Sequence, residues 1–102
     1  MKASVLHKFC TPPIFEEIDD PVCGPNSVVI ELKACGVCRS DHHAWSGNDP
    51  DVKLPHIMGH ELAGIIVETG SDIKKFSVGD HVTVPFILGC GLCSDCQTGN
   101  PT

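Results

Sequence analysis

The chain has 102 residues and a formal net charge of -6, and its seven Lys and Arg residues are scattered along the sequence. This distribution argues against nucleic acid as a partner, because a nucleic-acid interface needs a basic surface that neutralises phosphates. The longest apolar runs are far too short to span a bilayer, and Lys8 stands where a signal peptide needs an apolar core, so we expect a soluble, cytoplasmic protein with no membrane partner.

Short apolar segments separated by Gly, Pro, Asn and Asp dominate the chain. In chain order they predict strands at residues 3–9, 27–34, 62–69 and 81–85, with turns between them. Residues 39–46 lack turn residues and strand alternation, which indicates a short helix. Strands this short and this evenly separated favour a mainly β fold, most simply a barrel. The length supports one domain with one core.

Seven cysteines are present, and Cys90, Cys93 and Cys96 crowd into seven residues. Neighbouring thiols at this spacing cannot all pair with one another without strain, so the run favours a metal over a disulfide framework. The same run begins the motif of an iron-sulfur electron carrier, in which a fourth Cys follows after three residues. Position 100 is Asn, which disfavours this alternative.

A second group of metal-binding residue types lies upstream. His60 and Glu61 follow Cys38 by about twenty residues. Nitrogen and sulfur ligands suit zinc, and the carboxylate offers an additional oxygen. Cys35 and Cys38 also form a C-x-x-C pair, as in a redox dithiol, but such pairs usually belong to a thioredoxin-like fold, and no βαβ pattern is present. We interpret Cys38 as a metal ligand and Cys35 as a small packing residue.

Four motifs, in the right order, resemble those of the zinc-containing medium-chain alcohol dehydrogenases. Residues 59–70 have the pattern G-H-E-x-x-G-x5-G, and residues 36–43 are similar to the first catalytic zinc segment. Residues 77–83 resemble a barrel strand of that family, and residues 90–96 the beginning of its structural zinc lobe. The resemblance implies an N-terminal, GroES-like catalytic domain: a partly open β-barrel with a short helix and a cysteine-rich structural zinc loop.

The resemblance also implies roles for individual residues. Cys38 and His60 would be ligands of the catalytic zinc, and Glu61 an adjacent carboxylate able to replace water on the metal. Asp41 would orient His60, since such outer hydrogen bonds fix the tautomer of a ligand. The structural zinc would be bound by three thiolates, those of Cys90, Cys93 and Cys96.

Residues beside the catalytic zinc would handle the substrate and the cofactor. Ser40 would accept the alcohol proton and His43 would pass it towards solvent, a task that suits an imidazole titrating near neutral pH. Arg39 would face the pyrophosphate of the cofactor, with a solvated charge as the alternative. Trp45 and Phe86 would line the substrate pocket, although Trp45 suits a core aromatic that caps the barrel equally well.

The implied function is that of a zinc-dependent alcohol dehydrogenase, which acts on an alcohol or aldehyde with NAD or NADP as a homo-oligomer, dimer or tetramer. A polyol dehydrogenase and a non-catalytic GroES-like co-chaperonin are the alternatives. No G-x-G-x-x-G follows a strand, so we expect the Rossmann domain to lie outside residues 1–102. The third catalytic ligand and the fourth structural ligand are expected beyond Thr102. We therefore expect a truncated domain that is inactive alone.

Overall fold

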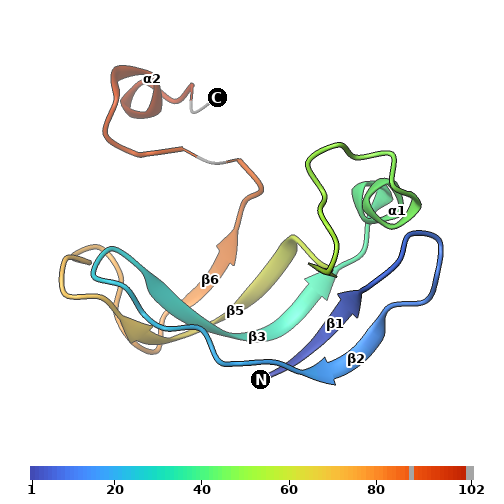
Figure 1. Ribbon diagram of the computed structural model, residues 1–102. Helices are drawn as coiled ribbons and strands as arrows, with labels where there is room; N and C mark the ends of the chain where they lie inside the picture. The colour runs from blue at the N-terminus through green and yellow to red at the C-terminus, as the bar shows by residue number, and fades with distance from the viewer. Residues whose placement is uncertain (88, 101–102) are drawn as a thin grey trace.

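The computed structural model describes residues 1–87 and 89–100 as six strands and two short helices, and Figure 1 labels all of them except β4. The predicted cysteine lobe is therefore described only as far as Asn100, and Leu88 lies outside the described residues. In chain order the elements are β1 (Lys2–Leu6), β2 (Ile14–Glu17), β3 (Val28–Gly36), α1 (Arg39–Ser46), β4 (His56–Ile57), β5 (Glu61–Thr69), β6 (His81–Val84) and α2 (Ser94–Gln97).

The strands form two antiparallel sheets of three strands each, in the orders β2-β1-β4 and β3-β5-β6. The long pair of β3 and β5 is the main support of the second sheet, and the β3–β5 ladder carries two register shifts that bend it. Gly64 lies in this ladder, and a Cβ there would overlap the carbonyl oxygen of Glu31. The second glycine of the G-H-E-x-x-G pattern thus permits β5 to approach β3 closely.

The predicted mainly β architecture is confirmed, with corrections to several elements. The helix at residues 39–46 and three of the strands are present within two residues of the predicted bounds. The first strand ends at Leu6 instead of residue 9, because the chain turns there and Cys10 adopts a φ of 58°. The strands β2 and β4 and the helix α2 were not predicted, because each has four residues or fewer and no clear periodicity.

The buried apolar core is small and lies mainly under the first sheet. Its members are few: Ala3, Val5, Leu6, Ala44 and Ile66. The radius of gyration is 15.4 Å, whereas a compact chain of this length has about 13 Å. The described residues are therefore less compact than a fully packed domain of the same length.

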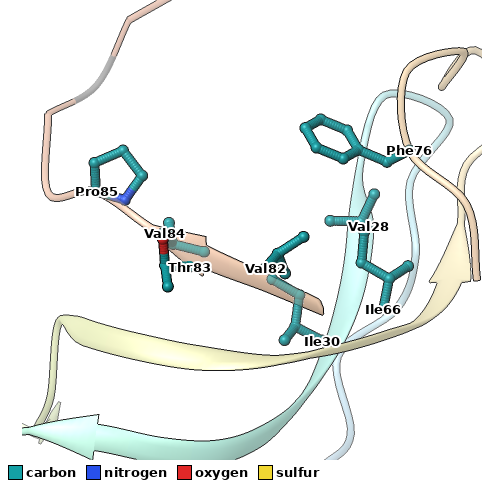
Figure 2. A pocket seen from close by; sticks show the side chains of 8 residues that line it. All are labelled: Val28, Ile30, Ile66, Phe76, Val82, Thr83, Val84 and Pro85. Atoms are coloured by element: carbon teal, nitrogen blue, oxygen red, sulfur yellow. The ribbon is translucent and has the colours of Figure 1, made fainter. Parts of the chain in front are cut away.

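One face of the sheet β3-β5-β6 carries an open apolar hollow of about 250 Å³ (Figure 2). Figure 2 shows side chains from all three strands converging on it, together with Phe76 from the connection between β5 and β6. Phe76 is 50% exposed and Val84 is 40% exposed, although both are of types that proteins usually bury. We call this surface the open face; its lining is Val28, Ile30, Ile66, Phe76, Val82, Thr83, Val84 and Pro85.

The segment that follows β6 extends away from both sheets and contains α2 (Figure 1). The cysteine-rich loop that the resemblance implies contains no strand within the described residues, but a short helix replaces part of it. Neither described helix is long and apolar enough to cross a membrane.

Candidate metal centre

The N-terminal end of α1 is capped by Cys38. Its side chain accepts the backbone N–H of Ser40 at 3.4 Å, and Asp41 Oδ2 accepts the backbone N–H of Cys38 at 2.8 Å. This is a capping box in which sulfur takes the place of the usual hydroxyl oxygen. The helix thereby fixes the direction of the Cys38 sulfur.

His60 lies just before β5 and meets this end of α1. Its Nε2 is 3.2 Å from Cys38 Sγ, and its Nδ1 is 3.2 Å from Asp41 Oδ1. Asp41 is buried, with 8% of its surface exposed, and its two oxygens serve two different groups. The predicted proximity of Cys38 and His60 is therefore present, with Asp41 behind the imidazole.

The donor set suits zinc. A tetrahedral ion with a sulfur ligand at about 2.3 Å and a nitrogen ligand at about 2.05 Å separates the two ligand atoms by about 3.6 Å. The observed separation of 3.2 Å needs only a small adjustment to admit such an ion. Candidate ligand atoms of Cys38, Asp41 and His60 lie within 4.8 Å of one another.

A cavity of about 390 Å³ adjoins these residues. Three residues of the predicted site, Ser40, Glu61 and Phe86, line it together with Cys38 and His60. The remaining lining residues were not predicted: Ala44, Asp49, Val52 and His56. Among these four residues, only His56 carries an imidazole. The one feature of the sequence that could have pointed to it is its position four residues before His60.

Other predicted residues take different positions. Glu61 does not belong to the convergent group, and its carboxylate lies over Gly36, where a Cβ would overlap it. Arg39 and His43 are exposed and are not among the residues that line the cavity. Trp45 also does not line it, and its indole N–H donates to the carbonyl of Thr11 at 2.8 Å.

The two thiols of the C-x-x-C pair have separate surroundings. Cys38 faces His60, whereas the thiol of Cys35 donates to the carbonyl oxygen of Gly36 at 3.5 Å. Cys35 is exposed, so its interpretation as a packing residue is wrong. The difference arises because β3 is an edge strand of its sheet and is half open to solvent near its end.

A second cluster of possible ligands, which we call the three-cysteine cluster, consists of Cys90, Cys93 and Cys96, whose sulfurs lie within 4.8 Å of one another. Cys90 Sγ accepts the backbone N–H groups of Leu92 at 3.5 Å and Cys93 at 3.4 Å. These two bonds stabilise the thiolate and lower the pKa of Cys90 to about 7. Cys93 occupies the N-cap position of α2 without a capping hydrogen bond from its side chain. The helix turns Cys96 back towards Cys90, and the sulfurs of these two residues are 3.8 Å apart.

Comparison with known proteins identifies the family of the chain. Residues 24–102 match the family described as the alcohol dehydrogenase GroES-like domain. The chain belongs to this family. The alcohol dehydrogenase B of Mycobacterium tuberculosis is 41% identical over 98 residues, which are 96% of this chain and 26% of that protein.

Solved structures of related dehydrogenases share the fold of this GroES-like domain. The cobalt- and zinc-bound thermostable alcohol dehydrogenase of Pyrobaculum aerophilum is 35% identical with a TM-score of 0.82, and the match covers 99% of this chain and 31% of that one. The structure of CAD from Helicobacter pylori complexed with NADP(H) is 32% identical with a TM-score of 0.82, covering 98% and 29%. The chain thus spans between a quarter and a third of the length of these relatives.

Proposed function

We propose that the chain supplies catalytic zinc ligands to a zinc-dependent alcohol dehydrogenase. The observation that carries the proposal is the convergence of Cys38 and His60, with Asp41 hydrogen-bonded to the far nitrogen of the imidazole. A ligand histidine usually donates its other ring N–H to a carboxylate, which orients the ring and raises its basicity. A co-chaperonin would have no use for such an arrangement.

Zinc bound at this site would act as a Lewis acid that lowers the pKa of an alcohol hydroxyl, which prepares the alcohol for loss of hydride to NAD or NADP. The chain's own residues would bind the substrate and move its proton. Ser40 lines the cavity beside Cys38 and would accept the hydroxyl proton. His43, one turn further along α1 and exposed, would pass it to solvent. Phe86 would cover the apolar part of the substrate.

The remaining predicted residues have weaker support. Glu61 lines the cavity and would reach the metal only after leaving Gly36, as a carboxylate that replaces water. Arg39 is exposed at the start of α1, where it would be free to meet a cofactor pyrophosphate. The three-cysteine cluster would bind a structural zinc, since three thiolates that already converge need one further ligand to close a tetrahedron.

The same proposal assigns the other parts of the enzyme to polypeptide outside residues 1–102. These parts are the Rossmann domain that binds NAD or NADP, the third catalytic zinc ligand and the fourth structural one. The proposal is supported by the greater length of the relatives and by the NADP(H) in one of their structures. The GroES-like domain is then incomplete in this chain, and we predict that the chain alone does not oxidise alcohols.

We further propose that the enzyme works in the cytoplasm as a homo-oligomer, on a small alcohol or aldehyde, without nucleic acid or membrane as a partner. The seven unpaired thiols suit a reducing compartment. The negative net charge gives no support to phosphate binding by the surface. Light scattering of the longer protein would measure the oligomeric state, and a monomer would contradict this part of the proposal.

The decisive experiment compares two neighbouring thiols in the longer protein. Cys38→Ala should abolish zinc binding at the catalytic site and reduce alcohol-dependent NAD(P)H formation to background. Cys35→Ala changes an exposed thiol outside the group of Cys38, Asp41 and His60, and should preserve both zinc binding and turnover. Zinc content would be measured by elemental analysis, and simple alcohols and polyols would be offered in parallel. Full zinc content and turnover in Cys38→Ala would disprove the proposal.

A further inference from the structure

The helix α1 contacts different parts of the molecule at its two ends. Its N-terminal end forms the capping box at the metal centre. At its C-terminal end, the carbonyl of Trp45 accepts the N–H of Cys10 at 2.9 Å, and the indole N–H of Trp45 donates to the carbonyl of Thr11 at 2.8 Å. Within the described residues no strand packs extensively along the helix. These two reciprocal hydrogen bonds are therefore a principal restraint on its orientation.

The loop between β1 and β2 is shaped to meet this end of the helix, and Figure 1 shows the two side by side. Cys10 has a φ of 58°, and Thr11 Oγ1 donates to the carbonyl of Lys8 at 2.7 Å. Gly47 ends the helix with a φ of 77°, and a Cβ there would lie 3.1 Å from the ring of Phe9. The loop thus fits closely around the last turn.

We propose that Trp45 is a positioning residue for the metal centre, acting through its hydrogen bond to the Thr11 carbonyl. The inference rests on the function proposed above. Cys38 and Asp41 move with α1, whereas His60 directly precedes β5. A helix of eight residues is about 12 Å long, so a tilt of about 5° at one end displaces the other by about 1 Å. A displacement of that size is large beside the 3.2 Å that separates Cys38 Sγ from His60 Nε2.

Direct contact with the substrate explains the position of Trp45 less well. Its ring is not among the residues that line the cavity beside Cys38 and His60, and its polar atom is already bonded to the loop. The indole therefore acts on the site through the helix.

The test is a comparison of amide resonances in the metal-free chain by two-dimensional NMR. Trp45→Phe keeps an aromatic ring and removes the N–H donor, and Phe9→Leu loosens the loop around Gly47 without touching either hydrogen bond. The control is Ile66→Val, which removes one methyl group from a side chain 1% exposed and distant from the loop in sequence. Trp45→Phe and Phe9→Leu should both shift the amide resonances of Cys38 and Ser40 clearly more than the control does. These two amides report on the capping box. Lower melting temperatures with Cys38 and Ser40 shifts no larger than in the control would overturn the proposal.

A second measurement separates this proposal from the proposed function. Cobalt affinity would be measured in the longer protein, with all three members of the three-cysteine cluster replaced by Ser. Trp45→Phe should weaken cobalt binding about tenfold, the lower end of the range for residues that orient ligands, and Ile66→Val should leave it unchanged. Equal affinity in Trp45→Phe and its parent would refute the positioning role alone. A parent that binds no cobalt would refute the zinc site, while the amide shifts would still report on the helix.

Discussion

Replacing Asp41 by alanine removes a carboxylate that serves two donors at once. Oδ2 accepts the N–H of Cys38 at 2.8 Å, and Oδ1 lies 3.2 Å from His60 Nδ1. The side chain is only 8% exposed, so water cannot easily take its place. One substitution therefore disturbs both the helix cap and the imidazole.

The expected losses follow from these two contacts. Each part-buried donor left without an acceptor costs about 1 kcal/mol, so the free energy of unfolding of the metal-free chain should fall by about 2 kcal/mol. Loss of a residue that orients a ligand typically weakens metal binding 10- to 100-fold, or about 1.4 to 2.7 kcal/mol. Metal affinity and stability should thus both decrease.

Chelator competition would measure zinc affinity, and urea denaturation would measure stability, both with the three-cysteine cluster replaced by Ser. Asp51→Ala is the matched control, because Asp51 is exposed and does not belong to the group formed by Cys38, Asp41 and His60. An Asp41→Ala chain with the stability and zinc affinity of its parent would show that the carboxylate is a solvated charge, and the orienting role would be refuted.

Three further predictions concern other parts of the chain. Gly64→Ala should lower the free energy of unfolding by about 2 kcal/mol or more, because its Cβ meets the Glu31 carbonyl. The loss should exceed that of Gly79→Ala, which is strained by a φ of 97° but whose Cβ meets no atom within 4 Å; thermal denaturation of both variants would test this order. The rate of alkylation of Cys90 in the metal-free chain, followed by mass spectrometry, should reach half its maximum near pH 7, because the lowered pKa of about 7 makes the thiolate dominant above that pH. A midpoint near pH 8.5, as for an ordinary thiol, would contradict the lowered pKa. A version extended by about ten residues should bind zinc more tightly at the three-cysteine cluster and resist protease better than this chain, and equal zinc content and protease resistance would argue against a structural zinc site.

Local patterns in the sequence predicted the long elements well. The helix at residues 39–46 has the observed bounds, because Cys38 can cap it, Gly47 ends it and no turn residue interrupts it. The strands β2 and β4 were not predicted, because they form only by pairing with β1. Segments of four and two residues are too short to show that tertiary contact in their own sequence. The helix α2 is equally short and was taken for loop.

The candidate site was predictable only in part. The pairing of Cys38 with His60 followed from a motif resemblance, and the distance between them agrees with it. The place of His56 beside the cavity and the anchoring of Trp45 on Thr11 depend on how the loops fold, and no periodicity marks either residue. Sequence patterns thus indicate which residue types bind a metal, whereas loop contacts decide which of the remaining side chains face the cavity.

The open face has a consequence for the thermodynamics of this chain. A fully packed domain of about 100 residues unfolds with a heat-capacity increase of about 1.2 to 1.5 kcal/mol/K, which scales with the apolar surface newly exposed to water. Here Phe76 and Val84 are already half exposed in the folded state, so the heat capacity of unfolding should be smaller and the thermal transition broader. Any surface that covers the hollow would then raise both the free energy and the cooperativity of unfolding. The stability of the sheet β3-β5-β6 would therefore depend on whether such a surface packs on it.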